Sequence, residues 1–196
     1  VRRPGGAAYV SIGFHAPAAT DADFWPTFVL ACILSGVGSL NVGSPGASGK
    51  SARLYRALVE KRLAVDANVY YGWSKDPDLF TVSATAWQGV SPARLEAAIL
   101  RELDRLASEA PAADEMASIR KQVRTQVVYS GDGVANLGSI LGSFEIAGSY
   151  RDFISMLDRV SAVSADDVQR VAARYLTEQN RTVGWFVPDG EGENNG

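Results

Sequence analysis

The chain has 196 residues, with 19 Lys and Arg against 22 Asp and Glu, a formal charge of −3, one cysteine and one histidine. This balance gives no electrostatic footprint for nucleic acid, and no uninterrupted apolar run of roughly 18 residues offers a membrane span. The single histidine, His15, excludes every metal motif that needs two histidines, including the HExxH and HxxEH zinc sites.

The two ends of the chain differ from its interior. The sequence opens with VRRPGG, without a Met or a signal-like segment, which predicts that it comes from inside a longer protein. Residues 189–196 are polar and Gly-rich with no apolar anchor, so we expect a disordered tail. Residues 1–188 are expected to form a single domain.

The first half of the chain predicts a strand, a helix, a long loop and a second helix. Alternating apolar residues over 7–15 are typical of a strand. Thr20 and Asp23 resemble a capping box, and the apolar residues up to Leu34 surround the whole helix, as in a buried helix. Residues 35–51 carry five glycines and predict a flexible loop, after which helical spacing resumes to about Val59.

The second half predicts a hairpin, a run of helices and a last strand. Residues 65–73 and 79–87 are rich in β-formers, with Asp76, Pro77 and Asp78 in the turn between them. Helical spacing follows over 92–106, 113–127, 137–144, 150–157 and 165–176, with Ser91 capping the first of these helices and Ser164 with Asp167 capping the last. A closing strand covers 183–187. This order predicts an α+β domain, in which helices pack on one face of an antiparallel or mixed sheet.

Two short motifs in the sequence resemble nucleotide-binding or catalytic motifs, but both are incomplete. Gly49, Lys50 and Ser51 could end a phosphate-binding G-x-x-x-x-G-K-[ST] loop, but Ser44 stands where the first glycine is needed, and a helix precedes the loop instead of a strand. Ser118 and Lys121 form an S-x-x-K pattern without its companion motifs, which favours a polar helix surface.

The remaining reactive residue types also have ordinary structural explanations. His15 ends a strand and has no G-x-S-x-G nucleophile to serve, so we expect a surface or edge residue. Asp76 and Asp78 suit a turn, and Cys32 lies within the buried helix, where it should be inert. The residues alone therefore indicate an α+β domain with a Gly-rich loop and no self-contained active site.

Two stretches of the sequence carry a family resemblance. Residues 43–64 read GSPGASGKSARLYRALVEKRLA. Residues 163–169 read VSADDVQ and lead through a helix to a last strand over 183–188, which is similar to the family's final strand ending in V-x-P. These segments resemble the Gly-rich stretch, the S-R-L-Y and L-R-E-K-R-G-L-A-Y patterns and the closing V-T-x-E-D-V-Q helix of one family. That family comprises the pitrilysin/insulinase-type zinc peptidases, including the mitochondrial processing peptidases, and the resemblance is to their C-terminal domains.

The resemblance implies one half of a two-part enzyme. In the family, two halves close like a clamshell around an unfolded peptide, and one half binds zinc through H-x-x-E-H and a downstream Glu. With one histidine, this chain resembles the metal-free half, so its zinc is expected in a missing N-terminal domain or a sister subunit. There the metal would activate a water molecule for peptide hydrolysis. The chain alone is expected to be inactive.

The resemblance also implies which residues meet the peptide. It places substrate contacts at Gly43, Gly46, Gly49 and Arg53, and no catalytic or metal-binding residue in this chain. Where the family has a substrate-holding Arg and Tyr, the chain has Val59, and Val65 or Asp66, depending on where a one-residue deletion falls. This departure leaves an alternative open, which is a non-catalytic scaffold or partner-binding subunit of the same fold.

Overall fold

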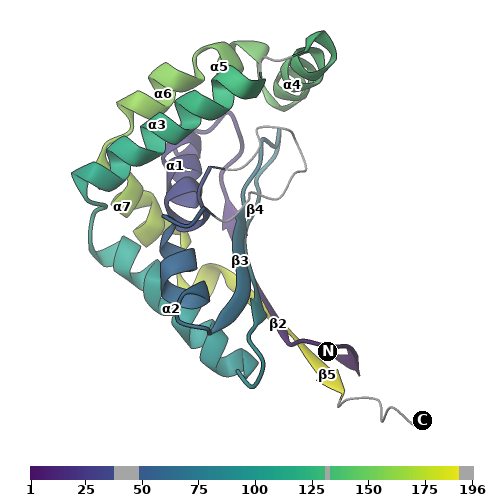
Figure 1. Cartoon of the computed structure of the whole chain (residues 1–196). Coiled ribbons are helices and arrows are strands. Elements are labelled where there is room, and N and C mark those ends of the chain that lie inside the picture. The colour runs from purple at the N-terminus through teal and green to yellow at the C-terminus, as the bar shows by residue number, and fades with distance from the viewer. Residues whose placement is uncertain (38–48, 131–132, 190–196) are drawn as a thin grey trace.

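A five-stranded sheet forms one layer of the molecule, and helices cover one of its faces (Figure 1). The computed structural model describes residues 1–37, 49–130 and 133–189. The strand order is β1-β5-β2-β4-β3. Strands β2, β3, β4 and β5 pair antiparallel, and the short β1 pairs parallel to β5. The strands are β1 (Arg2–Pro4), β2 (Tyr9–Ala16), β3 (Ala64–Tyr70), β4 (Asp78–Ala86) and β5 (Arg181–Asp189). The predicted α+β class, with helices on one face of the sheet, is confirmed.

Alternation along the strands fixes which face of the sheet is covered. In β2 the side chains of Val10, Ile12 and Phe14 are at most 1% exposed, and in β4 Phe80 and Val82 are fully buried. These positions oppose one another across the β2–β4 ladder, so their side chains leave the sheet on the same face. The intervening residues are exposed or partly exposed and form the other face.

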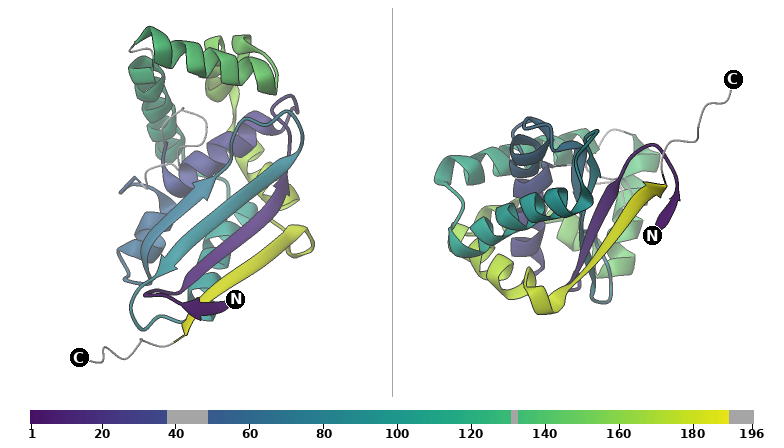
Figure 2. Two further views of the ribbon diagram at one scale, coloured as in Figure 1. Left: turned by 90° about the vertical axis from the view of Figure 1, so that its right-hand side faces the viewer. Right: turned by 90° about the horizontal axis from the view of Figure 1, so that it is seen from below.

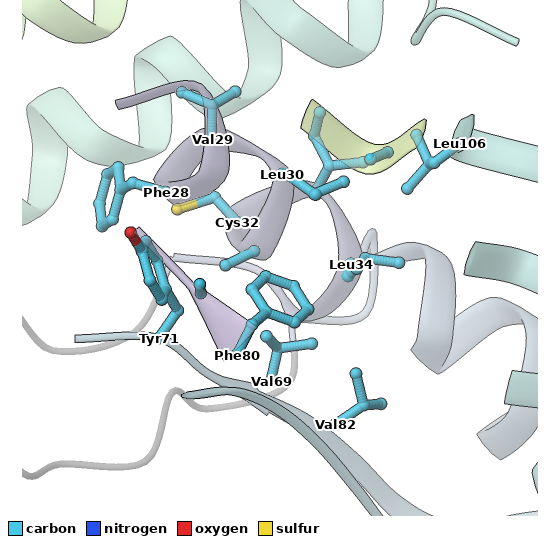
Figure 3. Close-up of a cluster of buried hydrophobic side chains, with 14 of the residues drawn as sticks. Phe28, Val29, Leu30, Cys32, Leu34, Val69, Tyr71, Phe80, Val82 and Leu106 are labelled. Atoms are coloured by element: carbon cyan, nitrogen blue, oxygen red, sulfur yellow. The ribbon is translucent and has the colours of Figure 1, made fainter. Parts of the chain in front are cut away.

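Helix α1 (Phe24–Ser35) lies between the sheet and the outer helices, and each of its residues is buried. Figure 3 shows its side chains Phe28, Leu30 and Leu34 in one cluster with strand residues such as Phe80 and Val82. A helix with neighbours on all sides needs apolar residues around its whole circumference, which is the pattern that the sequence carries. The predicted buried helix is confirmed, and Cys32 within it is buried as expected.

The predicted capping box before α1 is wrong. The backbone N–H of Asp23 donates to Asp21 Oδ1 at 2.8 Å, and Asp23 makes no side-chain cap of its own. The Asp23 carboxylate instead accepts hydrogen bonds from Arg170 at 2.7 Å, Arg174 at 2.7 Å and Tyr175 at 3.0 Å. Since these donors come from the last helix, Asp23 ties the start of α1 to a segment near the other end of the chain.

The predicted strand over 65–73 ends early, because its last aromatic residues leave the sheet. β3 stops at Tyr70, and residues 71–77 connect it to β4. The ring of Trp73 lies 5.0 Å from that of Phe24, 5.1 Å from that of Phe28 and 4.4 Å from that of Phe144, measured between centroids. Aromatic residues are common both in strands and in cores. The aromatic composition of this segment therefore predicted a strand that is longer than the observed one.

Seven α-helices, a π-helix and a 3-10 turn are present in the described residues. The element after the Gly-rich segment is a π-helix, and the predicted helix over 150–157 is two short ones that meet at Ser155. Ser91 and the Ser164–Asp167 capping box cap their helices as predicted. The remaining elements are η1 (Tyr55–Val59), α2 (Pro92–Ser108), α3 (Ala113–Ser130), α4 (Val134–Ala147), α5 (Tyr150–Ile154), α6 (Met156–Ala162), α7 (Ala165–Tyr175) and η2 (Glu178–Asn180).

The second face of the sheet is open. No helix of the described chain lies over it, as the left view of Figure 2 shows. Helix α4 stands at one end of the sheet and projects past it toward this uncovered side (Figure 1). None of the helices in the described ranges is long and apolar enough to cross a membrane.

Candidate functional site

The Gly-rich segment starts and ends at the C-terminus of α1. Of the expected substrate contacts, Gly43 and Gly46 lie outside the described residues. The N–H of Gly49 donates to the carbonyl of Ser35 at 3.1 Å. A Cβ placed on Gly49 would lie 3.8 Å from the Cα of Gly36, which is an ordinary contact. The backbone around Gly49 therefore has room for an alanine.

Arg53, the fourth expected contact, forms a two-point ion pair with Glu115 of α3. Its Nε donates to Oε1 at 2.8 Å and its Nη2 to Oε2 at 2.7 Å. The two side chains are only 15% and 17% exposed. The hydrogen bonds with Glu115 raise the pKa of the Arg53 guanidinium, against the effect of its partial burial. Arg53 thus anchors the start of the π-helix to α3, and two of its donors are engaged within the chain.

Replacing Arg53 by Ala is expected to lower the free energy of unfolding by about 1–3 kcal/mol, because it leaves the Glu115 carboxylate without its main donor. Arg56 limits the loss, since its Nη2 already lies 3.8 Å from Glu115 Oε1. Arg53→Lys keeps the charge but loses the two-point geometry, so it should fall between wild type and Arg53→Ala. Urea denaturation checks this order. Equal stability of all three proteins would show that the pair does not stabilise the fold.

A backbone position that suits glycine follows the π-helix by three residues. Arg62 has φ of 53°, the only positive φ among the described non-glycine residues. The family pattern quoted above has K-R-G-L-A where this chain has Lys61-Arg62-Leu63-Ala64, without the glycine. Arg62 therefore takes the left-handed conformation at the point where the pattern supplies a glycine. Placing the deletion there aligns Val65, whose side chain is 55% exposed, with the family's tyrosine.

Small and polar side chains line the centre of the open sheet face. Strand register places Ser11 beside Ser83 and Gly184, and Asn68 on the far side of Ser83. Larger residues lie on either side of this row along the strand direction, with Tyr9 and Phe186 on one side and Tyr70 and Leu79 on the other. The row itself is uncharged and crosses four strands.

The other reactive residues of the sequence do not assemble into a catalytic group. His15 is exposed at the end of the open face, beside Leu79 of β4. Burial raises the pKa of the Cys32 thiol to about 12, so it is an inert core residue. Ser118 and Lys121 are exposed on α3. Among the described ranges, no group of three or more His, Cys, Asp or Glu side chains is placed to hold a metal ion.

The sequence could not reveal Glu115 as a partner of this site. Its only signal was a position in the first turn of a helix, where acidic residues are common. Arg53 and Glu115 are separated by 62 residues, so only the tertiary fold brings them together.

These features define a class of protein domain. It is an α+β domain with one open sheet face and a Gly-rich connection after its buried helix, and its described residues hold no group of metal ligands. A sequence profile of the family described as the Peptidase M16 inactive domain matches residues 1–123. The chain belongs to this family. The resemblance to the metal-free C-terminal domain of zinc peptidases is thereby confirmed, and an inactive domain fits a chain with no cofactor of its own.

Solved structures support the assignment. The chain is 28% identical to a candidate zinc protease from Bordetella pertussis Tohama I, with a TM-score of 0.76, over 93% of this chain and 94% of that one. It is 27% identical to the inactive peptidase domain of a candidate zinc protease from Bordetella parapertussis, with a TM-score of 0.78, over 99% and 97% of the two chains. No curated protein sequence matches the chain.

Other similar structures are more than twice as long as the matched region. A protease from Helicobacter pylori has the same fold, with a TM-score of 0.85 at 19% identity, and the match covers 96% of this chain but 43% of that one. The fold also occurs in a protein of complex III2 from Candida albicans, at 16% identity and a TM-score of 0.71. The fold therefore recurs as one part of longer chains.

Proposed function

We propose that this chain is the metal-free half of a zinc-dependent metalloendopeptidase, and that its open sheet face forms part of the wall of a peptide-holding chamber. The single observation that carries the proposal is this uncovered face, in a member of an inactive peptidase-domain family. An antiparallel sheet can leave one face to solvent, but this face also exposes the large side chains of Tyr9 and Tyr70, which suit a contact surface. The partner half, a zinc-binding domain or a sister subunit, would close over it.

The chemistry of the open face suits unfolded peptides of many sequences. Ser11, Ser83 and Asn68 offer hydroxyl and amide groups that can donate to or accept from a peptide backbone. Tyr9 and Tyr70 are 38% and 43% exposed and offer aromatic contact area at the ends. The central row carries no charged side chain, while Asp66 lies one row further along the same face and accepts hydrogen bonds from Thr85.

The catalytic groups would come from the partner half. Zinc bound there supplies the Lewis acid and the activated water, while this chain supplies surface. Val59 and Val65 carry no hydrogen-bond donors, so the partner would also provide the charged contacts to the substrate. The proposed contacts of this chain outside the sheet are Gly43, Gly46, Gly49 and Arg53.

Reconstitution tests the proposal. The purified chain alone should bind no stoichiometric zinc and cleave no peptide, and mixing it with the zinc-binding half should give zinc-dependent cleavage. In that assembly Ser83→Arg, at the centre of the open face, should raise KM by about tenfold, while Ser161→Arg, at an exposed position of α6, should leave KM within about twofold. Cleavage by this chain alone, or equal kinetics of the two variants, would contradict the proposal.

The Gly-rich segment can be tested in the same assembly. Replacing Gly43, Gly46 and Gly49 together by Ala should raise KM for peptides with little loss of stability, since Ala fits at the described position 49. Unchanged kinetics would leave the segment as a connector.

A non-catalytic scaffold or partner-binding subunit remains the second candidate. The observation that favours it is the pair of valines, Val59 and Val65, at the positions where the family pattern has Arg and Tyr. Reconstitution separates the two candidates, since a scaffold would form the assembly without cleaving peptide.

A further inference from the structure

We propose that the outer side of α4 is the surface on which the partner half rests. This surface, called the α4 contact face, consists of Val134, Ala135, Gly138, Gly142 and Ile146. The proposal rests on the proposed function, because it names where the closing half makes contact. Val134 is 91% exposed and Ile146 is 78% exposed. They belong to the most exposed large apolar residues of the described chain, and they lie at the two ends of one helix.

The inner side of α4 is already used within the chain. Ile140, Phe144 and Ala147 are buried there, and the Phe144 ring lies 5.5 Å from the ring of Phe153 and 4.4 Å from that of Trp73. One side of the helix is therefore packed in the core. Val134 and Ile146 are exposed on the other side, together with Glu145, whose carboxylate accepts a hydrogen bond from the Tyr150 N–H at 2.9 Å. A surface helix that needs no partner would carry polar residues on that second side.

Two glycines lie between the exposed apolar ends. Val134, Gly138, Gly142 and Ile146 follow one another at intervals of four residues and share one side of the helix. A Cβ added to Gly138 or Gly142 would meet no atom within 4 Å among the described residues, so packing against that part of the chain does not require either glycine. Each costs the helix about 0.5–1 kcal/mol relative to alanine. A partner whose backbone or side chains approach α4 closely would explain why glycine is used at both positions.

The position of α4 and the length of similar chains both favour the partner half as the occupant. Helix α4 projects toward the side of the open sheet face (Figures 1 and 2), so a body covering that face would meet it. The region matched by this chain makes up 43% of the protease chain from Helicobacter pylori and 43% of a peptidase chain from Alicyclobacillus acidocaldarius. These two chains therefore carry enough further sequence for a second domain of similar size, whereas the two Bordetella chains do not.

Cysteine labelling tests whether the partner half covers the α4 contact face, with little labelling expected from the native cysteine. The native Cys32 is buried and its thiol has a pKa of about 12, so a maleimide reagent should report only an introduced cysteine. We would introduce Gly142→Cys, for which the structure has room, and Ala117→Cys on the exposed side of α3 as the matched control. Each variant is labelled as the isolated chain and in the assembly with the zinc-binding half, within one polypeptide or as two subunits.

The expected result is a labelling rate at position 142 that falls by about tenfold or more in the assembly, with less than about twofold change at position 117. Val134→Asp and Ile146→Asp should each weaken the assembly by about tenfold, and Ala117→Asp should not. Unchanged labelling at position 142 in a formed assembly would overturn the proposal. Protection in the isolated chain that rises with its concentration would also overturn it, because a second copy would then be the occupant.

The two proposals fail in different ways. If the assembly cleaves peptide while Gly142→Cys stays reactive, the proposed function stands and the α4 contact is wrong. If position 142 is protected in an assembly that cleaves nothing, the contact stands and the peptidase proposal is wrong.

Discussion

Replacing Phe144 by Ala is expected to lower the free energy of unfolding by about 3–5 kcal/mol, the range for truncating a buried aromatic side chain. Phe144 is 1% exposed and packs between Trp73 and Phe153. It is also a main contact of α4 with the core, so the loss should fall on α4 first. Urea denaturation followed by far-UV circular dichroism would give the stability change.

Phe144→Leu is the matched control, since it keeps an apolar side chain of similar length and should cost clearly less than Phe144→Ala. Hydrogen exchange would locate the effect, with amides of α4 exchanging faster than those of the sheet. A stability change below about 1 kcal/mol would show that α4 is held by other contacts. Under the further inference, Phe144→Ala should also weaken binding of the partner half.

Replacing Asp23 by Ala is expected to lower the free energy of unfolding by about 2–3 kcal/mol, because three donors from α7 lose their shared acceptor. The Asp23 side chain is 6% exposed, whereas those of Arg170 and Arg174 are 49% and 64% exposed. Water can solvate the two arginines after the change, which keeps the loss below that of a fully buried ion pair. Asp158→Ala, at an exposed position of α6, is the control and should change stability by less than about 0.5 kcal/mol.

The same carboxylate should make stability depend on pH. Burial of Asp23 raises its pKa, but the hydrogen bonds from Arg170 and Tyr175 and the charges of Arg170 and Arg174 outweigh burial and lower it below 3.8. A pKa lowered by folding contributes stability that is complete above the unfolded-state pKa and is lost as pH falls through the folded one. Wild type should therefore lose more stability than Asp23→Ala as pH falls below about 4. Parallel curves for the two proteins would contradict this.

Local patterns predicted most of the elements of this fold, because their causes lie within a few residues. The apolar circumference of α1 and the capping box at Ser164 are examples, and both are present. The role of Asp23 could not be predicted in this way, since its donors are 147 to 152 residues away. The spacing of Thr20 and Asp23 matches a capping box, but Asp23 makes no side-chain cap in the structure.

For the candidate site too, the sequence predicted local features but not contacts between distant residues. Short motifs predicted substrate contacts in the Gly-rich segment and at Arg53, and they showed that the family's Arg and Tyr are absent. The single histidine indicated the metal-free half of the enzyme. The Arg53–Glu115 pair and the α4 contact face required the packing of helices that are distant in sequence.

The closure of the Gly-rich segment at its base has a consequence for how such proteins can vary. Gly49 is hydrogen-bonded to Ser35 and lies against Gly36, so the two described ends of the segment meet at one point. Residues can be added between these anchors at little entropic cost, because closure entropy grows only slowly with length. Insertions there would leave α1 and the π-helix in place. This is a position where one descendant of the fold could gain a new specificity loop while another lost it, and where an epitope tag could be inserted.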